Sequence, residues 1–96
     1  MHRDIDLIIE MLTANVPGIH IEQLKVIHPG ADDDGLWFIN IHDHKEQVQI
    51  ESSDGMCPFL IESDFNNERL YGHTIEEVVA TVKRLYSLEN HLTNLN

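Results

Sequence analysis

The sequence predicts an α+β fold in which one antiparallel sheet carries both helices on one of its faces. Two segments, near the two ends of the chain, repeat apolar residues at helical spacing, while the middle of the chain alternates apolar and polar residues. Turn signals separate the alternating segments. Because each amphipathic helix needs a surface on which to bury its stripe, we expect a two-layer α/β sandwich with the order α-β-β-β-β-α and four strands.

The composition limits the number of domains, the partners and the cellular compartment that we expect for this protein. A chain of 96 residues is long enough for a single domain, over residues 1–96, and too short for two. Asp and Glu number 17 against 6 Lys and Arg, a formal net charge of −11. Six cations cannot follow a phosphate backbone, so we expect no nucleic-acid partner and no anionic membrane surface. The lack of a long apolar run predicts no membrane span and no signal peptide, and one cysteine fits a reducing cytoplasm.

The first helix is predicted over residues 4–14. Asp4 and Asp6 favour a helix start, because negative charge interacts favourably with the N-terminal end of the helix dipole. Pro17 and Gly18 mark its end. The apolar stripe consists of Ile5, Ile8, Ile9 and Leu12.

A first strand is predicted over residues 19–28, which are rich in β-branched side chains. The alternation is imperfect, since Ile19 and Ile21 fall on one face and Leu24 and Val26 on the other. A bulge or a late strand start would each explain this, and both remain open. A Pro-Gly pair and an acidic turn follow.

The next hairpins are predicted from turn chemistry. The Asp54-Gly55 pair between two alternating runs is typical of a two-residue turn. A loop at residues 43–46 would close the hairpin before it, although a shorter loop would keep the same faces. The expected pairs are Ile50 with Phe59, Val48 with Ile61, Ile41 with Val48 and Ile39 with Ile50. The expected core face is Trp37, Ile39, Ile41, Val48, Ile50, Phe59 and Ile61.

The last helix is expected to begin with a capping box at Thr74 and Glu77. Residues 68–73 are expected to link the last strand to this helix. Within this link, Arg69 is expected to pair with Glu62 or Asp64. Tyr71 is a possible interface anchor on the surface.

The sheet face opposite the helices is unusual for a solvated face, which is normally polar. Leu36, Phe38, Pro58 and Leu60 interrupt its polar residues. Two explanations remain open: scattered apolar side chains, which are ordinary, or a contiguous patch that binds a protein. We take these four residues as the candidate interface.

Residues suited to catalysis or metal binding are few. His42 and His44 would share a face if the strand continued through them, but a structural zinc site usually needs four ligands and nothing places His28 or His73 beside them. We expect Cys57 to face the core as a small apolar residue. The sequence therefore predicts no catalytic residue, metal site or cofactor.

These observations favour a small, acidic, non-catalytic protein-interaction or regulatory domain located in the cytoplasm. Its partner would be a second copy, giving a homodimer, or a basic protein, as an inhibitor or immunity-type protein requires. The alternative is a metal- or small-ligand-binding module that uses the histidines.

Overall fold

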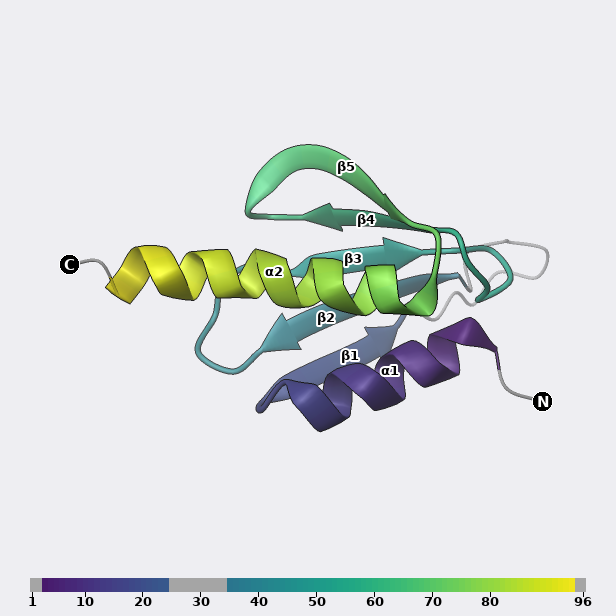
Figure 1. Ribbon diagram of the computed structural model, residues 1–96, viewed down its shortest axis with the longest axis horizontal. Coiled ribbons are helices and arrows are strands. Elements are labelled where there is room, and N and C mark those ends of the chain that lie inside the picture. Colours follow the sequence, from purple (N-terminus) through teal and green to yellow (C-terminus); the bar gives the residue numbers. More distant parts are fainter. Residues whose placement is uncertain (1–2, 25–34, 95–96) are drawn as a thin grey trace.

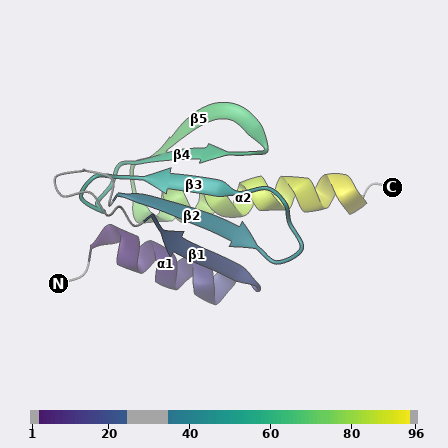
Figure 2. The same cartoon turned by 180° about the vertical axis from the view of Figure 1, so that it is seen from behind.

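The computed structural model describes residues 3–24 and 35–94. In these ranges five antiparallel strands form one sheet in chain order, and both described helices pack on the same face of it (Figure 1). Seen from behind, the other face carries neither of the two described helices (Figure 2). The α+β prediction is confirmed at this level. The elements are α1 (Asp4–Asn15), β1 (Ile19–Gln23), β2 (Leu36–Ile41), β3 (Val48–Glu51), β4 (Phe59–Ser63), β5 (Asn66–Gly72) and α2 (Ile75–Asn94).

The prediction of four strands is wrong, because residues expected to form a simple link form the edge strand β5. Its burial pattern shows why the sequence hid it: only Leu70 and Gly72 are at least partly buried, and the other five residues are exposed. An edge strand with one neighbour buries too little to show a clear alternation. The expected pairing of Arg69 with Glu62 is confirmed, with 3.4 Å between Nε and Oε2.

The predicted register of the β3–β4 hairpin is wrong by two residues. Ile50 lies opposite Ile61 and Val48 opposite Ser63, so the loop is longer than the Asp-Gly pair. A shift by an even number of residues leaves every side chain on its face, because strands repeat with a period of two. The faces were therefore predicted correctly while the pairs were not.

Contacts with α1 account for the longer loop. The Cys57 amide donates to Asp4 Oδ2 over 2.9 Å, and the Ile5 amide donates to the Gly55 carbonyl over 2.9 Å. The Ile5 amide lies in the first turn of α1, where backbone amides have no acceptor within the helix and need one from outside it. Gly55 has a φ of 73° and contacts Ile5 so closely that a Cβ would lie 3.0 Å from Ile5 Cγ2. The loop is therefore shaped by its contact with the helix as well as by its own turn.

The β2–β3 hairpin shifts in the same way, with Ile39 opposite Val48 and Trp37 opposite Ile50. Its loop is joined to the β4–β5 turn by two hydrogen bonds between Gln47 and Asp64. The Gln47 amide donates to Asp64 Oδ2, and the Asp64 amide donates to the Gln47 carbonyl, each over 3.0 Å. Because Gln47 and Asp64 directly adjoin the pair of Val48 and Ser63, these bonds extend the observed β3–β4 register.

The core lies between the sheet and the two helices. The predicted core face is confirmed, except that Ile41, at the end of β2, is half-buried. Strand β1 begins at Ile19, so its start is not late; residues 25–28 of the predicted strand and the turn after them lie outside the described residues. The buried cluster consists of Ile5, Ile8, Leu12, Trp37, Ile39, Val48, Ile50, Phe59, Ile61, Val78, Val79, Val82, Leu85 and Tyr86.

The Thr74 half of the predicted capping box is present at the start of α2. The Glu77 amide donates to Thr74 Oγ1 over 3.1 Å, which satisfies one of the free amides of the first turn. Within the described ranges, no helix combines the length and apolar character needed to cross a membrane.

Removal of this cap should have a measurable cost. Thr74→Ala is expected to lower the free energy of unfolding by about 1 kcal/mol, because an N-terminal amide loses its acceptor. Thr13, exposed in the interior of α1, provides the control, since alanine is the better helix former there and Thr13→Ala should cost nothing. Denaturant melts that rank the two variants equally would argue against the cap.

Candidate binding surface

The sheet face without helices carries a row of side chains that crosses the strands. Leu36 lies opposite Glu51, Glu51 opposite Leu60, and Leu60 opposite Tyr71. Opposed residues in an antiparallel pair point to the same face and lie close together. The Leu24 amide donates to the Leu36 carbonyl over 2.8 Å, which brings Leu24 to the end of the same row.

Phe38 lies in the next row, opposite Gln49 and Glu22. Together with Leu24 and Glu22 it lines a depression of about 510 Å³. The leucines and Phe38 are half-buried, while Tyr71 is 58% exposed. The structure thus brings three of the four predicted interface residues together. We define the outer patch as Leu24, Leu36, Phe38, Leu60 and Tyr71.

Pro58 is the fourth predicted interface residue. It lies in the β3–β4 loop, two residues before Leu60, and is exposed. Nearby in the same loop, Met56 is 39% exposed. This end of the surface is therefore formed by a loop, while the outer patch stands on strands.

Carboxylates lie within and beside the outer patch. Glu51 is exposed and sits in the row between Leu36 and Leu60. In the next row, Glu22 lies within 2.8 Å of His20 Nε2, and Glu62 faces Arg69. Such exposed pairs add little stability, so these charges remain available to a partner.

Polar amides occupy the neighbouring part of the same face. Gln47 Nε2 donates to Asn40 Oδ1 over 3.5 Å, and Gln49 Nε2 donates to Gln47 Oε1 over 3.4 Å. The outer face is thus divided, with amides on one side and apolar side chains around a central carboxylate on the other.

His42 and His44, the histidines considered as metal ligands, do not share the face of a continuing strand. Strand β2 ends at Ile41, and Asp43 has a φ of 72°, so the strand geometry expected for His42 and His44 does not continue. The His42 side chain is 84% exposed, whereas the His44 ring stacks edge-on against Tyr86 with 5.5 Å between centroids.

Among the described residues, no further metal ligands gather around His42 and His44. His73 is exposed beyond β5, and His28 lies outside the described residues. In the ranges that the structure describes, no group of three or more His, Cys, Asp or Glu side chains is arranged to hold an ion.

Cys57 is half-buried and packs against the core cluster. Desolvation, a hydrogen bond with the Asp4 carboxylate, and the charges of Asp4, Glu76 and Glu77 raise the pKa of its thiol to about 11. Because the thiolate is the nucleophilic form, this pKa leaves very little of the nucleophilic form near neutral pH. Cys57 thus packs against the core as expected, but it is half-buried and its thiol interacts with the Asp4 carboxylate.

Leu24 and Tyr71 belong to the outer patch but were not assigned to it from the sequence. The sequence indicates Tyr71 as an interface anchor, but its place beside Leu60 depends on the pairing of β5 with β4. Leu24 could have been found from its alternation with Ile19 and Ile21, once β1 was known to start at Ile19. Comparison of the chain with protein-family models, with curated proteins and with solved structures finds no match.

Proposed function

We propose that this chain is a non-catalytic interaction domain whose outer patch binds a basic segment of another protein. The observation that carries the proposal is the row Leu36–Glu51–Leu60–Tyr71, which places one carboxylate among apolar side chains. A partner that alternates apolar and cationic side chains would bury the apolar groups and pair its charge with Glu51. Exposed apolar area with a large aromatic residue is typical of protein-binding surfaces.

Charge favours a basic partner over a second copy of the chain. Two copies each carry a net charge of −11. A symmetric contact through the outer patch would bring two Glu51 carboxylates into one desolvated interface, where an unpaired charge is costly. A cationic partner removes both problems, and its attraction to the patch should weaken as salt is added.

A designed peptide that alternates leucine and lysine is a suitable probe of this surface. Backbone amide shifts should change in the strands around Phe38, Leu60 and Tyr71, and the changes should shrink at high salt. A peptide that alternates leucine and glutamate should leave the spectrum unchanged, because it repels Glu51. The free chain should be a monomer by light scattering.

Two leucine variants with the same change of charge provide the control. Leu60→Asp should weaken peptide binding at least about tenfold, because it removes an apolar contact from the patch centre. Leu7→Asp, at an exposed position of α1, should leave binding unchanged. Equal losses in both variants, shifts spread over the helices, or a stable dimer through the patch would contradict the proposal.

A further inference from the structure

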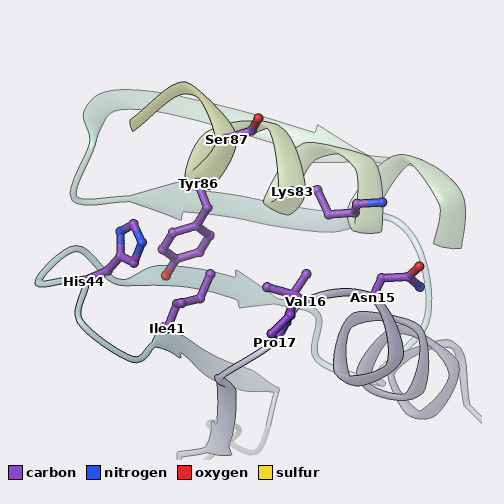
Figure 3. A pocket seen from close by; sticks show the side chains of 8 residues that line it. All are labelled: Asn15, Val16, Pro17, Ile41, His44, Lys83, Tyr86 and Ser87. Carbon is purple, nitrogen blue, oxygen red and sulfur yellow. The ribbon is translucent and has the colours of Figure 1, made fainter. Parts of the chain in front are cut away.

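A second surface feature lies on the helical side of the molecule, away from the outer patch. It is a pocket of about 380 Å³ between the end of α1, the end of β2 and the middle of α2 (Figure 3). Val16 and Ile41 supply apolar side chains, and His44 and Tyr86 lie together on one side of it. None of the eight described residues that line it is acidic, although the chain has 17 Asp and Glu.

The other side of the pocket carries donors. Lys83 extends from α2 toward the side where Asn15 ends α1 (Figure 3). No described carboxylate forms an ion pair with Lys83. The Asn15 amide nitrogen donates one hydrogen to the Met11 carbonyl over 2.6 Å and carries a second. A cation and an amide donor near apolar side chains suit a ligand that is anionic at one end and apolar along its body.

The Tyr86 side determines how such a ligand would be oriented. The Tyr86 hydroxyl, which has one hydrogen, lies 3.0 Å from the Ile39 carbonyl and 3.1 Å from the Glu46 carbonyl. Desolvation, together with the charges of Asp64 and Glu46, raises the pKa of this hydroxyl to about 12, so it stays neutral. These nearby carboxylates disfavour an anion beside Tyr86 and favour one beside Lys83.

We propose that this pocket binds a small carboxylic acid in its ionised form, with the carboxylate at Lys83 and the hydrocarbon body over Val16 and Ile41. This function is independent of the outer patch, and it makes the chain a small-ligand-binding protein whose site does not require a metal.

Three probes with the same hydrocarbon chain and different head groups test the charge requirement: hexanoate, hexanamide and hexylamine. In titrations followed by amide shifts at constant ionic strength, hexanoate should saturate and shift the signals of Val16, Ile41 and His44. Hexanamide should bind at least about tenfold more weakly, since hydrogen bonds to an ionised group are the stronger ones. Hexylamine should bind no better than hexanamide.

Variants of two neighbouring cations of α2 distinguish a direct contact between Lys83 and the carboxylate from a general effect of the protein's net charge. Lys83→Gln and Arg84→Gln change the net charge equally and both alter exposed side chains, but only Lys83 is among the described residues that line the pocket. Lys83→Gln should weaken hexanoate binding about tenfold, and Arg84→Gln less than about twofold. Hexanoate that causes no saturable shift, tighter binding of hexylamine, or equal losses in both folded variants would overturn the proposal.

Discussion

Replacement of Phe59 by alanine is expected to lower the free energy of unfolding by about 3–5 kcal/mol. The Phe59 side chain is fully buried and meets Trp37 edge-on, with 6.2 Å between ring centroids. Its removal loses this contact and leaves a cavity between the sheet and the helices that the neighbouring side chains fill only partly. Since small domains have about 5–15 kcal/mol of stability in total, denaturant melts should show a large shift of the midpoint.

Phe38 provides a matched control on the opposite face of the same sheet. It is half-buried and belongs to the outer patch, so Phe38→Ala leaves no closed cavity. We expect this variant to cost less than about 1.5 kcal/mol. Similar losses for the two phenylalanines would mean that the faces of the sheet are assigned incorrectly.

The second large effect is expected where β5 contacts α2. A Cβ atom on Gly72 would lie 2.4 Å from Val78 Cγ2 and 3.1 Å from the Val78 backbone. Val78 is fully buried and cannot turn away without displacing the core. Gly72→Ala should therefore lower the free energy of unfolding by about 1–3 kcal/mol, measured by chemical denaturation.

A double-mutant cycle identifies the cause of that loss. Val78→Ala removes the methyl group that the new Cβ would meet, at its own cost of about 2 kcal/mol for the lost burial and cavity. In this background Gly72→Ala should cost at least about 0.5 kcal/mol less than in the native chain. Additive losses would show that the strand tolerates the new side chain by moving elsewhere.

The two candidate sites show which features of a site can be predicted from the sequence and which cannot. Leu36, Phe38 and Leu60 could be assigned to one face because their alternation relative to buried neighbours is regular. Their arrangement in a row around Glu51, and the addition of Tyr71, depend on which residues lie opposite one another across the strands. The pocket at Lys83 was not predicted, because its walls come from α1, β2 and α2, and no local pattern relates them.

The sequence by itself determined the helices, the class of the fold and the face on which each residue of the middle strands lies. Helical and strand periodicities are local properties, and burial of an apolar stripe follows from them without knowledge of partners. It did not determine register, since alternation with a period of two is satisfied equally by pairings that differ by two residues. For the β3–β4 hairpin the tertiary structure decided between them, because the loop after β3 contacts a distant segment, with the Cys57 amide donating to Asp4 of α1. The edge strand β5 was likewise decided there, because Leu70 and Gly72 have a core to face only once β4 and α2 are in place.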